Sequence, residues 1–358
     1  MRIKPIVLTL AICGTLSSQS YSTKNAKRVE PRSANADPLP CTYLIDTADL
    51  GIRGTEGGME FTIITGSTCP WSISGLPPWL RVSGSAQGTG SAEVTLEADN
   101  NPGGLRVAVF MVAGVAVPIR QFDPSVCSAG TGCSLRPVPH VASGGEWTTA
   151  LFAVNPTTHA ADWSATFYDD NGSPIALPFT GRVGNVSTLT SSIPALGRID
   201  YEAGNASLAV QGSWGLITTD IATTTQALFR RAVANGIYYE AAVPTSDGYN
   251  EFVIPFDATT FLPTGAPLYT GFAIANLNPS GAAHIVCTAR DQSGTVIPNA
   301  VTIPSLNPLG HYAGYSFPVL TGKRGTLDCS ADTLVSAIAL RVIGTEAFST
   351  LPVIVNDP

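Results

Sequence analysis

The segment Ala92-Glu93-Val94-Thr95-Leu96-Glu97-Ala98 alternates apolar and polar side chains without a break. Successive side chains of a β-strand point to opposite faces of a sheet, so this pattern predicts a strand with one buried face. The next six residues, Asp99-Asn100-Asn101-Pro102-Gly103-Gly104, are of types that favour tight turns. Helical periodicity is weak along the whole chain, and threonine and valine are abundant. The sequence therefore predicts an all-β fold.

The composition excludes several classes of protein. Charged residues make up 13% of the 358 residues, against about 25% in ordinary soluble domains, which argues against helical bundles and coiled coils. The net charge is −7 and the basic residues form no cluster, so we expect no binding to nucleic acid. The hydrophobic content of 44% is too high for a disordered chain.

The N-terminus has the pattern of a secretory signal peptide. Arg2 and Lys4 precede a short apolar run, 5–14, which is followed by small polar residues. This arrangement predicts a signal peptide over 1–22 and a secreted, cell-surface or periplasmic protein. The apolar run is too short to cross a bilayer, so we expect no membrane span in the mature chain. Lipidation at Cys13 is an alternative, although a bulky isoleucine stands where lipoprotein sites place a small residue.

Changes in composition suggest the domain organisation. A polar linker over 23–40 precedes a β-rich module at 41–122. A connector rich in proline, glycine and cysteine follows at 123–139, and we place two repeats at 140–245 and 246–358.

The two repeats are inferred from an internal duplication. Four pairs of segments match in order: Trp147–Pro156 with Tyr269–Pro279, Phe167–Ser173 with Ala289–Thr295, Pro194–Gly197 with Asn307–Gly310, and Ala227–Arg230 with Ile338–Arg341. The spacing between partners changes only slowly. Copies of about 100 residues with regularly spaced turns fit two β-sandwiches, with Asn155-Pro156 and Asn278-Pro279 at equivalent strand ends.

The mature chain keeps six cysteines: Cys41, Cys69, Cys127, Cys133, Cys287 and Cys329. An even number in an exported chain favours disulfides, and six cysteines allow 15 connectivities. Pairing by segment predicts Cys41–Cys69, Cys127–Cys133 and Cys287–Cys329. The duplication aligns Cys287 with Ala165 and Cys329 with Thr219, so both partners of the last pair are absent together from the first repeat. Since no Cys-x-x-Cys or Cys/His cluster occurs, we expect no metal and no cofactor.

Candidate catalytic groups are sparse. The four histidines, His140, His159, His284 and His311, share no metal-ligand spacing, so we interpret each as a surface or structural side chain. No Gly-x-Ser-x-Gly motif is present. The acidic run 169–172 is better explained as a hairpin turn than as a calcium loop. The sequence therefore favours a protein without catalysis.

The tryptophans are more informative. Trp71 follows Cys69-Pro70 beside an expected disulfide and is predicted to be a core side chain. Trp79 follows two prolines and is either a core side chain or a partly exposed one. An exposed indole can stack on the C–H face of a pyranose. Trp79 is therefore the candidate carbohydrate-binding residue, and Asn100 and Asn101 could add hydrogen bonds if their turn lies at the same end.

The module at 41–122 resembles the BACON family. The matching features are Cys41-Thr42-Tyr43, Gly57-Gly58, Cys69-Pro70-Trp71-Ser72-Ile73, Trp79-Leu80-Arg81-Val82, Gly88-Thr89-Gly90-Ser91-Ala92, Ala98-Asp99-Asn100-Asn101, Arg106, Ala113-Gly114 and Gln121. The resemblance implies an immunoglobulin-like β-sandwich that binds carbohydrate or glycoprotein, and it supplies no ligand residue. The region 140–358 resembles tandem β domains of exported bacterial proteins that have no assigned activity.

Together these observations predict an exported, non-catalytic binding protein with one immunoglobulin-like module and two repeated sandwiches. The expected partner is a glycan or glycoprotein. Two alternatives remain open at this point. One is a secreted hydrolase with 140–358 as its catalytic β domain, and the other is a purely structural surface or adhesion protein.

Overall fold

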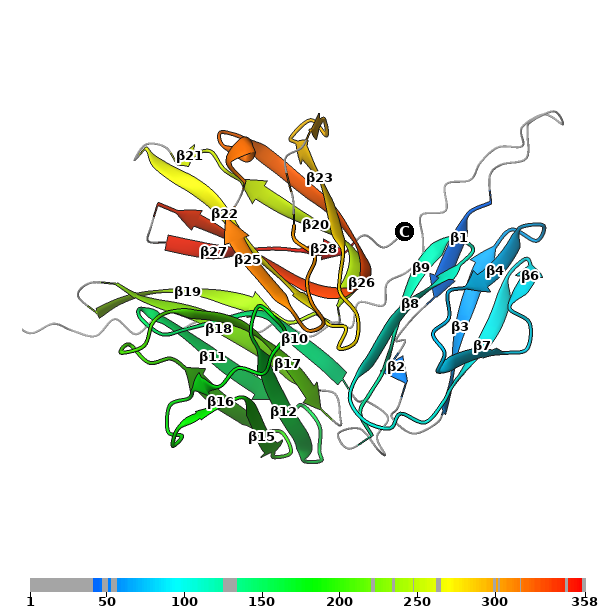
Figure 1. Ribbon diagram of the computed structural model, residues 1–358, viewed down its shortest axis with the longest axis horizontal. Helices are drawn as coiled ribbons and strands as arrows, with labels where there is room; N and C mark the ends of the chain where they lie inside the picture. The colour runs from blue at the N-terminus through cyan, green and yellow to red at the C-terminus, as the bar shows by residue number, and fades with distance from the viewer. Residues whose placement is uncertain are drawn as a thin grey trace, which may run out of the picture. The chain divides into compact units, whose positions relative to one another are not determined.

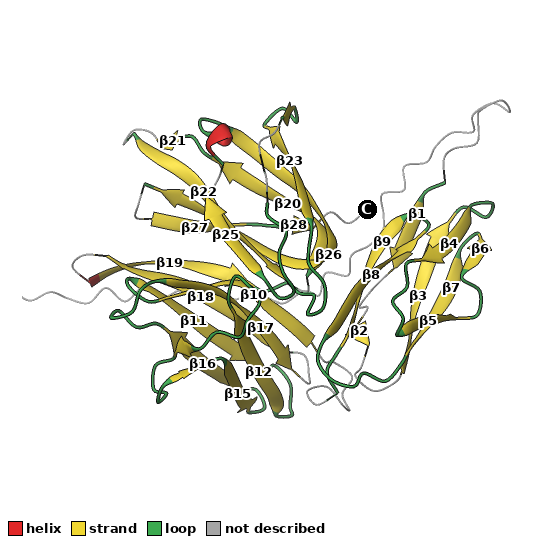
Figure 2. Cartoon of the chain, in the orientation of Figure 1, coloured by secondary structure: helices red, strands yellow, loops and turns green. Residues whose placement is uncertain are grey.

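The structure, a computed structural model, describes residues 41–46, 51–52, 57–124, 134–219, 223–233, 236–246, 248–261, 265–298, 301, 303–315, 317–344 and 347–355. Strands and loops make up nearly all of this part of the chain, with a short 3-10 helix, η2 (Pro318–Leu320) (Figure 2). The predicted all-β fold is confirmed. The expected signal peptide, the linker and the Cys127–Cys133 pair lie outside the described residues. Where the chain is described, no helix is long and apolar enough to cross a membrane.

The N-terminal module consists of two sheets (Figure 1). One has the order β1 (Tyr43–Asp46), β3 (Gly57–Thr65), β7 (Ala92–Ala98), β5 (Leu80–Ser83), and the other β2 (Gly51–Ile52), β9 (Val115–Gln121), β8 (Arg106–Val112), β4 (Pro70–Ser74), β6 (Gln87–Thr89). Val94, Leu96 and Ala98 are buried, as the alternation in β7 predicts. Apolar side chains of both sheets form one cluster, so the module is a sandwich. Its predicted disulfide, Cys41–Cys69, is present.

The first repeat likewise has two sheets, each with four strands. One has the order β10 (Ser134–Ser143), β17 (Gln211–Thr219), β12 (Ala161–Tyr168), β15 (Thr188–Ile193), and the other β16 (Arg198–Ala203), β11 (Trp147–Val154), β18 (Thr224–Val233), β19 (Ile237–Pro244). A small hairpin joins β13 (Leu177–Pro178) to β14 (Asn185–Val186). The strand β10 begins at Ser134, inside the predicted connector, because residues before 140 already pair with β17.

In the second repeat one long strand, β26 (Arg324–Ile343), links the strands into a single nine-stranded sheet. Its first part pairs with β20 (Tyr249–Asp257) and β23 (Ile285–Asp291). Its last part pairs with β22 (Ala266–Asn276) and β27 (Ala347–Leu351). The remaining strands are β21 (Thr260–Phe261), β24 (Val296–Ile297), β25 (His311–Tyr315) and β28 (Ile354–Val355).

The strand pairing of the first repeat recurs in the second. The corresponding strands are β10 and β20, β11 and β22, β12 and β23, β16 and β25, and β19 and β27. The first part of β26 corresponds to β17, and its last part corresponds to β18. The turns agree in detail, since Leu196 and Leu309 have φ of 54° and 55°. The matching patterns of strand pairing in the two repeats are the structural counterpart of the sequence duplication.

The structure corrects two of the residue pairs that the sequence matched between the repeats. The side chain of Asn155 donates to the carbonyls of Ile193 and Pro194, and that of Asn276, not Asn278, donates to the matching carbonyls of Leu306 and Asn307. The shared Asn-Pro dipeptide is misleading because Asn276 is followed by an extra residue pair before its proline.

The second correction concerns the cysteines. Cys287 lies opposite Cys329 in the ladder, whereas Ala165 lies opposite Ile217. Ile217, not Thr219, is therefore the counterpart of Cys329. The predicted Cys287–Cys329 disulfide is confirmed.

The second repeat covers one side of the first. The strands β10 and β19 are edges of the two sheets of the first repeat, and β22, β26 and β27 lie against them. Ala273, Ile338 and Phe348 thereby join the core cluster of the first repeat. Apolar burial provides most of the free energy of folding, so the first sandwich depends on the second for part of its core.

Candidate functional site

Trp79 lies at the edge of the N-terminal module where β5 begins. The backbone amide of Leu80 donates to the carbonyl of Pro77 (3.0 Å), which closes a turn around the tryptophan. The carbonyl of Trp79 accepts from the amide of Asp99 (2.8 Å), which ties this turn to the end of β7. The indole is half-buried and packs in part against the module core. Trp79 thus has both a core-facing and an exposed part.

The structure brings Asn100 to the same edge and excludes Asn101. Asn100 is exposed and directly follows Asp99. Asn101 is 1% exposed, and its side-chain amide donates to the carbonyls of Gly104 (2.6 Å) and Phe122 (2.9 Å). A buried amide that is fully hydrogen-bonded holds a turn and leaves nothing for a ligand. Asn101 is therefore withdrawn as a candidate binding residue.

Two arginines add charge at this edge. Arg81 contacts Asp99 (2.6 Å) and Glu97 (3.0 Å), in pairs that are largely exposed and so contribute little to stability. The guanidinium carbon of Arg106 lies 5.7 Å from the centroid of the Trp79 ring, a cation–π distance. We call Trp79, Arg81, Asp99, Asn100 and Arg106 the Trp79 edge.

The Trp79 edge can contact a small ligand that has both an apolar face and many hydroxyl groups. The indole supplies apolar area, the arginines supply donors, and Asp99 and Asn100 supply acceptors. Because Arg106 lies over the indole, a ligand must contact the part of the ring that Arg106 leaves exposed. By contrast Trp71 is 8% exposed and donates to the carbonyl of Gly90 (2.9 Å), as expected of a core residue.

A histidine contact that the sequence analysis missed joins the two repeats. Nδ1 of His140 lies 3.1 Å from Nε2 of His311, and Nδ1 of His311 donates to Oδ1 of Asp170 at 2.7 Å. The two rings are nearly parallel, and the side chain of His311 is fully buried. We call His140, Asp170, His311 and the backbone around them the repeat junction.

Burial controls the charge of the repeat junction. Burial, reinforced by the neighbouring His311, lowers the pKa of His140 to about 3, although the carboxylate of Asp170 acts in the opposite direction. The hydrogen bond from His311 lowers the pKa of Asp170 below its usual range. At neutral pH the junction therefore holds a neutral His140 and an ionised Asp170.

The low pKa of His140 predicts acid sensitivity. An unfolded histidine has a pKa near 6.5, so below that pH the unfolded chain binds a proton that the folded chain does not. The contribution of His140 is complete above pH 6.5 and is lost as the pH falls toward 3. We expect stability to fall by about 2–3 kcal/mol between pH 7 and pH 4 from this residue.

Urea unfolding at both pH values measures that loss. His140→Asn should show a flatter pH dependence than the wild type, whereas His159→Asn, at an exposed histidine of the same repeat, should match it. Equal pH dependence for His140→Asn and the wild type would contradict this assignment.

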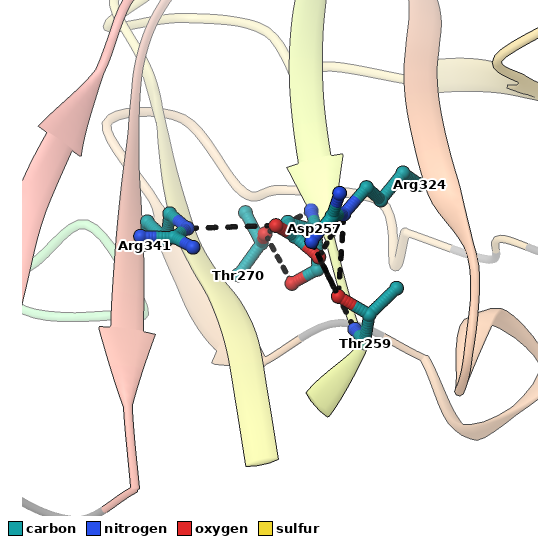
Figure 3. A network of polar contacts seen from close by, with 5 residues as sticks. All are labelled: Asp257, Thr259, Thr270, Arg324 and Arg341. Carbon is teal, nitrogen blue, oxygen red and sulfur yellow. Dashed lines mark hydrogen bonds and ion pairs between the residues drawn. The ribbon is translucent and has the colours of Figure 1, made fainter. Parts of the chain in front are cut away.

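A second polar network ties together the end of the second repeat (Figure 3). The hydroxyl of Thr259 and the Nε of Arg324 donate to Oδ1 of Asp257, at 2.6 and 3.0 Å, and Nε of Arg341 lies 3.5 Å from Oδ2 (Figure 3). Burial alone would raise the pKa of Asp257, but these hydrogen bonds and the charge of Arg324 outweigh it and lower the pKa.

This network elaborates a contact that both repeats share. The hydroxyl of Thr270 bonds the backbone of Asp257 just as that of Thr149 bonds the backbone of Ala142. Since the first repeat has the same threonine contact with no carboxylate, the Asp257 network is interpreted as structural. In the described part of the chain, no group of three or more His, Cys, Asp or Glu side chains could hold a metal ion.

Comparison with known proteins adds no further constraint. No model of a known protein family matches this chain, and no curated protein matches it. The resemblance of residues 41–122 to the BACON family rests on the residue pattern alone.

Proposed function

We propose that this is an exported, non-catalytic protein that binds carbohydrate or glycoprotein through the Trp79 edge. The observation that carries the proposal is the half-buried Trp79 beside the exposed Asn100 and two arginines. A sugar presents apolar C–H faces and hydroxyl groups together, which matches this set of side chains. The disulfides Cys41–Cys69 and Cys287–Cys329 are compatible with an extracellular location.

The site is shallow, so the affinity should be modest. A single half-buried indole with a few hydrogen bonds supports a Kd on the order of 0.1–1 mM. Such a site gains strength when several copies contact one polysaccharide.

Removing the indole should abolish binding. We expect Trp79→Ala to lose retardation in native gels that contain soluble polysaccharides, and Asn100→Ala to weaken it several-fold. Asn205→Ala, at an exposed asparagine of the first repeat, serves as the control and should migrate like the wild type. Because Trp79 packs partly on the core, the melting temperature of each variant is measured in parallel. Retardation of folded Trp79→Ala equal to that of the wild type would refute the assignment.

The same gels separate the two alternatives. A hydrolase would shorten the polysaccharide and release reducing ends during incubation. A purely structural protein would migrate identically with and without polysaccharide.

A further inference from the structure

A turn of the second repeat serves as a docking element. The indole Nε1 of Trp214 donates to the carbonyl of Leu309 (2.7 Å), and the amide of His311 donates to the carbonyl of Asp170 (3.1 Å). The backbone at Gly172 lies so close that a Cβ there would be 1.9 Å from the carbonyl oxygen of Pro308. The turn Asn307–Gly310 thus lies against a hairpin and against strand β17 of the first repeat.

The first repeat carries the same turn, Pro194–Gly197. Gly197 donates to the carbonyl of Pro194 (2.9 Å), as Gly310 donates to that of Asn307 (2.8 Å). Leu196, the third residue of the turn in the first repeat, has a positive φ of 54° and is 73% exposed. Val154, at the adjacent end of β11, is 44% exposed. The turn of the second repeat is therefore docked, whereas the matching apolar turn of the first repeat is exposed to solvent.

The receiving surface is also duplicated, and its second copy is uncovered. The hairpin Asp291–Thr295 corresponds to Asp169–Ser173, since each begins with an aspartate that accepts from the amides two and four residues later. A Cβ at Gly294 would meet no atom within 4 Å, in contrast to one at Gly172. The second repeat thus presents an open counterpart of the surface that receives the docked turn.

The side chains of the two uncovered surfaces are complementary. Arg198 takes the position of His311. Its side chain is 68% exposed and donates to Asp200 (2.9 Å), which leaves other N–H groups of the guanidinium for a further acceptor. The exposed Gln292 takes the position of Asp170. An arginine can donate to the carboxamide oxygen of a glutamine. Thr326 takes the position of Trp214 and offers a hydroxyl donor on a shorter side chain.

We propose that the Pro194–Gly197 turn of one molecule docks on a second copy of this chain. The receiving surface there is the hairpin Asp291–Thr295 together with Thr326. The two surfaces differ, so the contact is head-to-tail and leaves one of each free to continue an open chain. Gln292 and Thr326 make a weaker contact than Asp170 and Trp214, which hold the docked turn of the second repeat. The association is therefore transient, of the kind that small interfaces support.

Cysteine cross-linking tests this contact. The backbone amide of His311 donates to the carbonyl of Asp170 at 3.1 Å, so the two backbones lie as close as a disulfide requires, and cysteines at the corresponding positions in two molecules should be able to bond. We expect a mixture of Arg198→Cys and Gln292→Cys proteins to form a disulfide-linked dimer under mild oxidation. The yield should exceed by about ten-fold that of either protein alone.

Two controls keep the test decisive. Val183 is fully exposed in another loop of the first repeat, so a mixture of Val183→Cys and Gln292→Cys proteins reports random collision. Adding Leu196→Asp to the Arg198→Cys protein should reduce its cross-linking to that background. A yield for the Arg198→Cys mixture no higher than the Val183→Cys control, or one unchanged by Leu196→Asp, would overturn the proposal.

Discussion

Gly172→Ala should lower the free energy of unfolding by about 3–5 kcal/mol. Gly172 has φ of 85°, a conformation that costs any residue with a Cβ about 1–2 kcal/mol. The new Cβ would also lie 1.9 Å from the carbonyl oxygen of Pro308, so the repeat junction must move apart to admit it. That movement strains the hydrogen bonds of Asp170 and Trp214, which accounts for the remaining loss.

Gly294→Ala is the matched control. Gly294 holds the corresponding place in the second hairpin with φ of 82°, but open space surrounds it. Its replacement should cost the conformational strain alone. The difference between the two variants, measured by urea unfolding, gives the contribution of the junction. Equal losses would show that the repeats do not press together at Gly172.

Removing the Cys287–Cys329 disulfide should cost roughly 3–4 kcal/mol. The bond closes a segment with a sequence separation of 42, and in the chain-entropy model a loop of this size restricts the unfolded chain by about that amount. The first repeat supplies the variant, because Ala165 and Ile217 occupy the two positions there. Cys287→Ala combined with Cys329→Ile therefore removes the bond while keeping apolar side chains in the ladder.

Denaturant unfolding of this double variant under non-reducing conditions measures the effect. Its midpoint should fall below that of the oxidised wild type. In dithiothreitol, which reduces Cys41–Cys69 in both proteins, the variant and the wild type should unfold at similar midpoints. A double variant as stable as the oxidised wild type would contradict the expected contribution of the disulfide.

Much of the fold could be predicted from local sequence patterns. Strict alternation in residues 92–98 identified a strand with one buried face, since each side chain of a strand has only two directions available. The order of matching segments in 140–358 identified the repeated strand pairing, and segment proximity identified two disulfides. These features depend on neighbours in sequence or on repetition, both of which can be seen without a structure.

Features that depend on distant contacts could not be predicted. His140 and His311 are separated by 171 residues, and nothing near either one indicates the other. Asn100 and Asn101 are alike in sequence, yet one faces solvent and the other points to the backbone of Phe122. The Asn-Pro dipeptides aligned Asn155 with the wrong residue, because chemical likeness of a dipeptide does not fix the register of a ladder.

The most direct test of the proposed function is a glycan array probed with the chain lacking its first 22 residues. The Trp79 edge predicts a limited set of related glycans bound by the wild type, with the signal lost in folded Trp79→Ala. No glycan bound above background, or the same glycans bound equally by the variant, would contradict carbohydrate recognition at this edge.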